Sequence, residues 1–360
     1  MFQDTTPFIL ALIITFTVLI CIAIWNSINS RPPYEKGPPP TPGPSRTREI
    51  LSRFSQFYNN LSPEDGCIYD AAILPDPKQH IIHALYVGYD ESESVRSVSL
   101  VGESRETTII DGQGEAICIK FPINGYSSPT VRGFTIRNGY ADGSMEQGSF
   151  NQGGGISIYQ NYDSIKLQDI SIESCTSDWS GGGIYSLGST LEMNNVHLLN
   201  NTADQFGAGI LFGSEVQNPN IETLYIENSL FSNNTAGTRG GGMHVENADV
   251  NILNSSINLN SAGHGGGISI NTGTVTLDNV VVSGNASEGG GAGIYEDLND
   301  AELTIRESEI SGNITQSNGG GILLENQGQT KIMNSEISGN SSVSWGSGIF
   351  INHEIHMHGA

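Results

Sequence analysis

The chain has 360 residues and a formal net charge of −23, because 38 Asp and Glu residues stand against 15 Lys and Arg residues. This balance argues against nucleic acid or an anionic membrane surface as the partner, since both are bound through a basic footprint. The 45 glycines are nearly twice the share of roughly 7% that is usual. Together with 37% hydrophobic residues, they predict a packed, glycine-punctuated core and exclude a disordered acidic chain.

The N-terminal segment predicts a membrane helix. Residues 8–25 carry no charge, and a helix of that length nearly crosses a hydrocarbon layer of ~30 Å. We expect residues 1–30 to be a single-pass anchor; a signal peptide is the alternative, although no basic residue precedes the span and no A-x-A-like site follows it. The orientation of the anchor in the membrane stays open. The positive-inside rule would leave the following domain in the cytoplasm, whereas the rest of the sequence is typical of an extracellular or periplasmic domain. The cations behind that rule are Arg31, Lys36, Arg46 and Arg48.

Two short segments follow the anchor. Residues 31–46 are rich in proline and predict an extended linker. Residues 47–66 predict a short amphipathic helix that caps the next domain and ends in a turn at Ser62–Gly66. Its apolar residues recur at helical spacing: Ile50, Leu51, Phe54, Phe57, Tyr58 and Leu61.

The remainder of the chain, residues 67–360, repeats itself. A Gly-rich triplet followed by an apolar residue occurs eight times, beginning at Gly153, Gly181, Gly207, Gly240, Gly265, Gly291, Gly319 and Gly346. Between the triplets apolar residues alternate with period two, as in Leu191-x-Met193 and Val250-x-Ile252, which is the pattern of strands. Short strands at a period of about 27 residues predict an all-β solenoid, a right-handed parallel β-helix of roughly nine to ten coils.

An asparagine recurs once in each coil. Its positions are Asn201, Asn234, Asn260, Asn285, Asn313 and Asn340, with Cys175 in the preceding coil. We expect these side chains to stack as a buried ladder, because an amide can donate to one neighbouring coil and accept from the other. Inward stacking also explains the sequons at Asn285 and Asn313 better than glycosylation does.

The repeats resemble two groups of known proteins. Phe231-Ser-Asn-Asn234 followed by Gly-Gly-Gly-Met243 is similar to the FxxN and GGxI repeats of chlamydial polymorphic membrane proteins. The stretches 98–103, 108–112 and 133–139 are similar to the opening coils of right-handed β-helix proteins of the pectate-lyase-like superfamily. The resemblance covers roughly residues 67–351 and implies a secreted or surface β-helix, either an adhesin or a carbohydrate-active protein. Its motifs are structural, so they indicate the fold more than the function.

The strand after each Gly triplet supplies the candidate site. We expect its first and third following residues to point outward together. The third column then lines up Glu246, Asn271, Asp297, Glu325 and Asn352 over five coils, beside His244 and Tyr295 of the first column. Asp297 and Glu325 would lie one strand spacing apart, which suits a shared Ca²⁺ or a pair of carboxylates with separated roles. We expect no other cofactor.

Glu296 breaks the pattern, because it occupies an inward column that six other coils fill with an apolar residue: Ile158, Phe212, Val245, Ile270, Leu324 and Ile351. Such violations favour a functional residue, so Glu296, Asp297 and Glu325 are weak catalytic candidates. The alternative is that the strand ends early and that Glu296, Asp297 and Asp300 form a solvated acidic loop. Gly263-His264-Gly265 resembles a catalytic motif of polygalacturonases, but the column of His264 varies freely, and we expect an exposed corner residue there.

Three further features are weaker. Glu309 and Glu336 predict a second stacked acidic pair on a solvent face. His353, His356 and His358 form a terminal cluster that could bind metal. Cys67 and Cys118 could form a disulfide, which the sequence alone does not decide.

Two classes of function remain open, beside a third alternative, a purely structural spacer. One is a membrane-anchored surface protein that binds polysaccharide or a cell-surface ligand through the side of its solenoid, as in adhesion. The other is a lyase, hydrolase or epimerase of acidic glycans. The repeats offer few basic residues to hold uronate carboxylates, notably Arg239, Arg306 and Lys331, and these do not stack in one column. The sequence therefore favours binding over catalysis.

Overall fold

The computed structural model describes the four strands between residues 67 and 88, and residues 99–121, 128–146, 149–160, 164–214, 221–297, 301–325 and 328–352. The predicted anchor, linker and capping helix, and the histidines after residue 352, lie outside the described residues. Within the described part, no helix has the length and apolar character needed to span a membrane.

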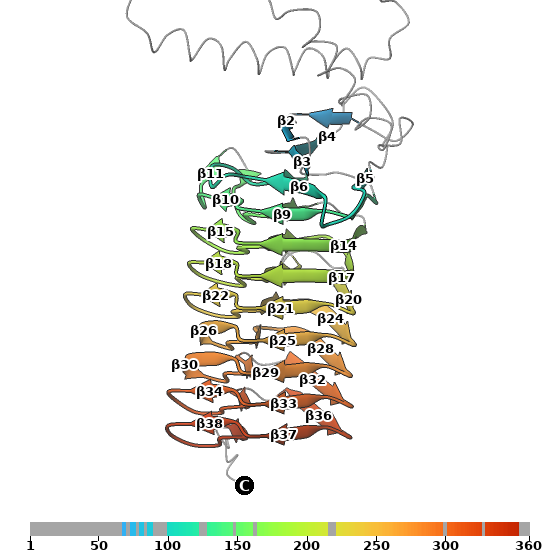
Figure 1. The fold of residues 1–360 in the computed structure, drawn as a ribbon. Helices are drawn as coiled ribbons and strands as arrows, with labels where there is room; N and C mark the ends of the chain where they lie inside the picture. Colours follow the sequence, from blue (N-terminus) through green and yellow to red (C-terminus); the bar gives the residue numbers. More distant parts are fainter. Residues whose placement is uncertain are drawn as a thin grey trace, which may run out of the picture.

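The described chain is an all-β parallel solenoid of about eight turns, stacked as a column in Figure 1. Each full coil contributes strands to three parallel sheets, here named sheets A, B and C. A solenoid was predicted from the repeat and is confirmed.

From β13 onward, each strand of sheet A follows a Gly-rich triplet. Its strands, in order, are β1 (Cys67–Tyr69), β4 (Leu85–Gly88), β7 (Ile119–Lys120), β13 (Ile156–Tyr159), β16 (Ile184–Leu187), β19 (Ile210–Gly213), β23 (Met243–Glu246), β27 (Ile268–Ile270), β31 (Ile294–Glu296), β35 (Ile322–Leu324) and β39 (Ile349–Ile351).

Sheet B consists of two rows of strands, which the long strands β14 (Ile165–Glu173) and β17 (Leu191–Leu199) join. The first row holds β5 (Leu100–Val101), β8 (Thr130–Arg132), β20 (Thr223–Glu227), β24 (Ala248–Leu253), β28 (Gly273–Asp278), β32 (Ala301–Arg306) and β36 (Gln329–Met333). The second holds β2 (Ile73–Asp76), β3 (Gln79–Ile82), β6 (Thr108–Asp111), β9 (Thr135–Arg137), β21 (Leu230–Ser232), β25 (Ser256–Asn258), β29 (Val281–Ser283), β33 (Glu309–Ser311) and β37 (Glu336–Ser338).

Sheet C is the shortest. It holds β10 (Tyr140–Ala141), β15 (Thr176–Ser177), β18 (Thr202–Ala203), β22 (Thr235–Ala236), β26 (Ser261–His264), β30 (Ala286–Gly290), β34 (Ile314–Thr315) and β38 (Ser341–Ser342). A separate hairpin joins β11 (Met145–Glu146) to β12 (Ser149–Phe150).

The first strands explain why fewer coils form than the nine to ten expected. β1 pairs with β4, and β2 with β3, in antiparallel register. β3 and β4 then stack in parallel on β6 and β7 of the next coil, so β1 and β2 add antiparallel strands and not a further regular coil. Parallel stacking is continuous from β4 onward in sheet A.

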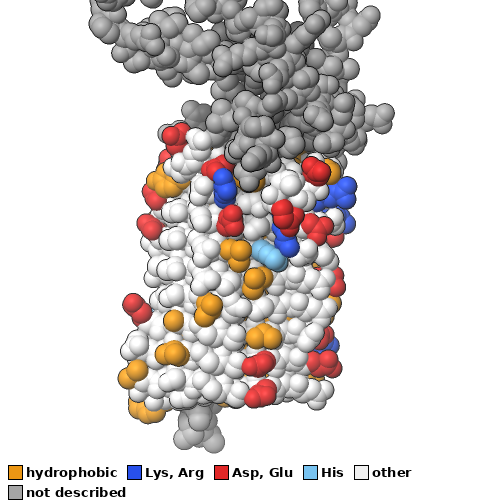
Figure 2. Space-filling view, in the orientation of Figure 1, with side chains coloured by type: hydrophobic (Ala, Val, Ile, Leu, Met, Phe, Trp, Pro, Cys, Tyr) orange, Lys and Arg blue, Asp and Glu red, His pale blue; other side chains and the backbone are white. Residues whose placement is uncertain are grey.

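Alternate residues of each strand fill the interior, as the period-two pattern predicts. In β17, Leu191, Met193, Val196 and Leu198 are buried, and the residues between them face outward. The outer surface in the view of Figure 2 is mostly uncharged and polar, with acidic and hydrophobic side chains scattered over it.

The asparagine ladder is confirmed. Each of Asn201, Asn234, Asn260, Asn285 and Asn313 donates through Nδ2 to the Oδ1 of the next member, at 2.9 to 3.0 Å, and the last acceptor is Asn340. Asn285 and Asn313 are fully buried, so the folded chain does not offer either sequon for glycosylation. The ladder follows the corner between sheets B and C and joins successive coils there.

The structure decides the question of a Cys67–Cys118 disulfide, which the sequence leaves open. Cys118 is a free, buried thiol, so no bridge to Cys67 forms. Its neighbour is Cys175, the residue that stands in the ladder column; a hydrogen bond with that thiol, together with burial, raises the pKa of Cys118.

Candidate functional site

The residues predicted to bind a ligand lie along sheet A, but only one of their two columns is accessible. His244 and Tyr295 of the first column are 2% and 3% exposed. In the third column Glu246, Asn271 and Asp297 are partly exposed, and Glu325 and Asn352 are exposed. The expectation that both columns reach solvent is therefore wrong for the first.

The cover over the first column comes from the residue that precedes each Gly triplet. The ring of Phe206 stacks on His244 with centroids 5.0 Å apart. The ring of His264 lies 4.9 Å from that of Tyr295. His264 is thus partly buried against an aromatic ring and is not the exposed corner residue that we expected.

Five side chains meet at one place on this face, and we call them the Tyr295 cluster: Arg239, His264, Tyr295, Asp297 and Glu325. Tyr295 lies in β31, Asp297 follows that strand and Glu325 follows β35, one coil further on. The phenol oxygen of Tyr295 is 2.7 Å from Oδ1 of Asp297 and 2.7 Å from Oε2 of Glu325. The structure therefore brings the two predicted carboxylates together around one hydroxyl.

Arg239 completes the cluster from two coils away. Its guanidinium forms a salt bridge with Oδ2 of Asp297 and lies 5.7 Å from the centroid of the Tyr295 ring. The Arg239 and Asp297 side chains are 29% and 13% exposed, so the ion pair is partly shielded from water. Ser269 stands in the first column of the intervening coil, and its small size leaves room for the long arginine side chain to pass.

The phenol of Tyr295 is held in its protonated form. Burial, and hydrogen bonds to Asp297 and Glu325, raise the pKa of Tyr295 far above its ordinary value. A phenol has one proton to donate, so it can serve only one of the two carboxylates at a time. The other carboxylate is left with an oxygen for a hydroxyl donor from a ligand.

The imidazole of His264 is held neutral near pH 7. Burial and the positive charge of Arg239 lower the pKa of His264, and the charges of Glu325 and Asp297 only partly oppose this. A neutral imidazole both donates and accepts a hydrogen bond.

A second polar group continues the same face in the two coils before β31. Nε2 of His244 lies 3.3 Å from Oε2 of Glu246, and Nδ2 of Asn271 donates to Oε1 of Glu246 at 2.7 Å. Burial alone would raise the pKa of Glu246, but the hydrogen bond and charge of His244, with help from Asn271 and Arg239, hold it below the ordinary range. Glu246 is therefore ionised at neutral pH.

Two atoms of this second group are buried without a partner in the described part of the chain. They are Nδ1 of His244 and Oδ1 of Asn271. Buried polar atoms almost always find a hydrogen bond, because leaving one unpaired costs about 1 to 3 kcal/mol. The third column is thus polar, ordered and incompletely satisfied.

Glu296 points inward, as its column indicates. It is fully buried in β31, and its Oε2 accepts a hydrogen bond from Thr330 at 3.3 Å. The alternative of a strand that ends early with Glu296 in a solvated loop is therefore wrong. Glu296 also faces away from Asp297 and Glu325, so the structure does not bring the three catalytic candidates together.

No metal centre of three or more His, Cys, Asp or Glu side chains is found among the described residues. Asp297 and Glu325 are close enough to share a cation, but Arg239 already supplies positive charge to Asp297. Calcium at this pair stays a prediction. Glu309 and Glu336 are in register on sheet B and exposed, as the stacked solvent-facing pair was expected to be.

Comparison of the chain with protein-family models, with curated proteins and with solved structures finds no match. The likeness of its repeats to pectate-lyase-like and polymorphic membrane proteins therefore rests on the quoted motifs and on the solenoid fold. The function has to be argued from the geometry of the site.

Proposed function

We propose that this chain is a membrane-anchored, surface-exposed adhesion protein that binds polysaccharide through the third column of sheet A. Residues 8–25 would hold it in the membrane, and the solenoid would stand outside the cell or in the periplasm. As part of the proposal, the coils wind right-handedly, like those of the pectate-lyase-like and polymorphic membrane proteins that the repeats resemble.

The observation that carries the proposal is the line of hydrogen-bonding side chains from Glu246 to Asn352. It crosses five consecutive coils, and four steps of about 4.8 Å give it a length of roughly 19 Å. The side chains are already ordered by contacts with one another, because Asn271 binds Glu246 and Asn352 binds Glu325 at 3.4 Å. Ordered groups lose little entropy on binding, and carboxylates and amides are suitable partners for sugar hydroxyls.

Charge argues for binding of neutral or cationic glycans over processing of acidic ones. Arg239 is the cation of the Tyr295 cluster, and Asp297 neutralises it. A uronate would therefore meet the carboxylates of Glu246 and Glu325 with no unpaired positive charge beside them in the cluster.

The test is glycan binding by the full chain in detergent micelles, on an array of neutral, amino-sugar and uronate polysaccharides. We expect retention on a neutral or amino-sugar polymer. The double variant Asp297→Asn, Glu325→Gln should bind at least tenfold more weakly, because hydrogen bonds to charged groups contribute about 1.5 to 3 kcal/mol each and 1.4 kcal/mol is a factor of ten.

The matched control is Glu309→Gln, Glu336→Gln, which removes the same number of charges from the exposed pair on sheet B and should bind like the parent chain. Loss of binding in both double variants would mean that binding depends on the total negative charge and not on the site at Asp297 and Glu325. New chain ends that disappear in the Asp297→Asn, Glu325→Gln variant would show the alternative function, a lyase or hydrolase. Retention on no glycan would overturn the proposal.

A further inference from the structure

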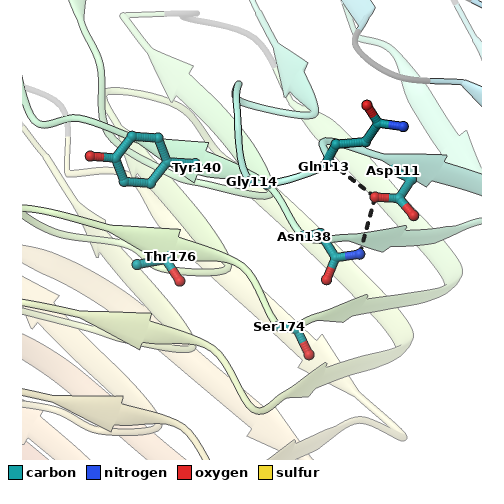
Figure 3. A pocket seen from close by; sticks show the side chains of 8 residues that line it. Asp111, Gln113, Gly114, Asn138, Tyr140, Ser174 and Thr176 are labelled. Atoms are coloured by element: carbon teal, nitrogen blue, oxygen red, sulfur yellow. Dashed lines mark hydrogen bonds between the residues drawn. The ribbon is translucent and has the colours of Figure 1, made fainter.

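A separate hollow lies at the corner between sheets B and C, on the first coils of the solenoid (Figure 3). Its volume is about 500 Å³, and side chains of three successive coils line it. Those used below are Asp111, Gln113, Asn138, Tyr140, Ser174 and Thr176. None of them belongs to the Tyr295 cluster.

The hollow exists because the first coil has a tight turn at this corner, where later coils have a strand of sheet C. Sheet C begins only with β10, and the preceding coil makes a tight turn instead, in which the N–H of Glu115 donates to the carbonyl of Gly112 at 3.0 Å. Gly114 adopts φ +73° at the tip of this turn, and a Cβ there would meet nothing within 4 Å. The turn forms one wall of the hollow and leaves its interior open.

Asp111 lies in that wall, and its carboxylate is paired with neighbouring groups. Nε of Arg137 donates to its Oδ2 at 2.8 Å, and its Oδ1 accepts from Nδ2 of Asn138 and from the N–H of Gln113, both at 3.0 Å. The carboxylate is 9% exposed. It is neutralised by Arg137 and saturated with donors, so its role is to hold Gln113 and Asn138 in place.

The remaining lining is uncharged and amphipathic. Figure 3 shows the ring of Tyr140 on one side with Thr176 below it, and the amides of Gln113 and Asn138 on the other side with Ser174 below them. The hydroxyl of Tyr140 donates to Asp178 at 2.5 Å, which fixes the ring. A fixed aromatic ring beside amides and hydroxyls offers a stacking surface and several hydrogen-bonding groups together.

The charge and polarity of the lining limit the class of ligand that the hollow can bind. An anionic ligand would find no unpaired cation in this lining, and the negative charges of Asp142, Asp178 and Asp204 act on Tyr140. A lipid chain would leave the amides and hydroxyls unpaired, which is costly. A saccharide without charge satisfies both limits, because it has hydroxyls around its edge and C–H groups on its ring face.

The corner continues past the hollow in the direction of the solenoid axis. The outward residues of sheet C that follow Tyr140 are in register and carry hydroxyls: Thr176, Thr202 and Thr235. Successive coils repeat at about 4.8 Å. A polymer could therefore lie along the corner with one ring in the hollow.

We propose that the hollow beside Tyr140 is a binding site for one end of a neutral glycan, with its terminal ring stacked on Tyr140. This proposal rests on the proposed function for the class of ligand, and it adds a second site on a different part of the surface. The ring of Tyr140 supplies the stacking, and Gln113, Asn138, Ser174 and Thr176 supply the hydrogen bonds.

The experiment is calorimetric titration of the full chain with three neutral hexasaccharides as probes: cellohexaose, laminarihexaose and chitohexaose. At least one should bind, Tyr140→Ala should weaken that binding at least tenfold, and Tyr140→Phe, which keeps the ring, should stay within about threefold. The matched control is Tyr225→Ala, because Tyr225 is 51% exposed on sheet B; it should leave the affinity unchanged. Thr176→Val replaces a hydroxyl at the rim of the hollow by a methyl group of similar volume and should also weaken binding. The test can therefore be completed even if Tyr140→Ala does not fold.

The outcomes separate the two sites. Weakening by Tyr140→Ala and not by Asp297→Asn, Glu325→Gln supports the hollow, whatever the fate of the proposed function. Weakening only by the Asp297→Asn, Glu325→Gln pair, or only by Tyr225→Ala, overturns the hollow as the site. Failure of all three hexasaccharides to bind overturns it as well.

Discussion

Asn260 shows how much one residue of the ladder does. Its N–H and its Nδ2 both donate to Oδ1 of Asn285, at 2.9 and 3.0 Å, and Nδ2 also donates to the carbonyl of Phe231 at 3.0 Å. Its own Oδ1 accepts two hydrogen bonds from Asn234, both at 2.9 Å. A single buried amide thus satisfies polar groups of three coils, where water has no access.

We therefore expect Asn260→Ala to lower the free energy of unfolding by about 3 kcal/mol or more, since each buried group left unpaired costs about 1 to 3 kcal/mol. Urea unfolding followed by circular dichroism measures this. Asn251→Ala removes the same side chain from an exposed position of β24 and should change stability by no more than about 0.5 kcal/mol. Equal effects of the two substitutions would mean that the side-chain hydrogen bonds of the ladder contribute nothing to the free energy of unfolding.

Asp111 gives stability a dependence on pH. Burial works to raise its pKa, but hydrogen bonds from Arg137, Asn138 and the N–H of Gln113, with the charge of Arg137, leave it below the ordinary value of 3.8. A carboxyl whose pKa is lower in the folded state stabilises the fold above the unfolded pKa, and this contribution is lost as the pH falls through the folded pKa.

Asp111→Asn should consequently be less stable than the parent chain at pH 7, by about 1 to 3 kcal/mol for a lost charged hydrogen bond. The difference in melting temperature should shrink as the pH falls below the ordinary carboxyl range, because the parent chain then loses the same contribution. Melting curves of both proteins across that range provide the measurement. A difference that stays constant on acidification would contradict the role given to the ionised carboxylate.

At the scale of elements, the turns before the Gly triplets decide what the outer face of sheet A offers. Period-two alternation correctly predicts that Tyr295 and Asp297 share the outer face of this sheet, and parallel register correctly predicts that Asp297 and Glu325 are neighbours. Alternation says nothing about a turn that folds over the sheet. The burial of His244 under Phe206 and of Tyr295 under His264 was therefore outside what the strand pattern could show.

The same turns explain why Arg239 and His264 were missed as site residues. Each stands in a column whose members vary from coil to coil, which indicates a solvent-facing corner. Two of its members pack on the first-column residue of the next coil, Phe206 on His244 and His264 on Tyr295. A signal was present in small neighbours: Gly289, where a Cβ would clash with the ring of His264, stands in the turn of Tyr295's own coil, and Ser269 stands in the first column of the coil before. Small residues at both places leave space that His264 and Arg239 fill from earlier coils.

At the scale of the molecule, repetition is why the fold was predictable and the ends were not. Each internal coil meets a copy of its own pattern above and below, so the asparagine ladder and the apolar columns give the stacking directly. Among the described residues, β1 and β2 pair in antiparallel fashion with β4 and β3, and only β3 and β4 stack in parallel on the next coil. The hollow beside Tyr140 arises at that irregular beginning, from a turn without a counterpart in later coils, and no repeated motif could reveal it.

The net charge of −23 makes a prediction about binding at this scale. A neutral glycan releases no counterions when it binds, so its affinity should change little between about 50 and 500 mM salt, although the Debye length falls severalfold over that range. A polyuronate should be repelled at low salt and should bind no better than weakly once the field is screened. Titration of the full chain with a neutral glycan and with polygalacturonate, each over the salt series, measures both affinities.

A steep fall in affinity for the neutral glycan with rising salt would show that charged groups of the ligand or of a co-ligand carry the binding. In that event neither the third column of sheet A nor the hollow beside Tyr140 would explain recognition by its hydrogen bonds and stacking.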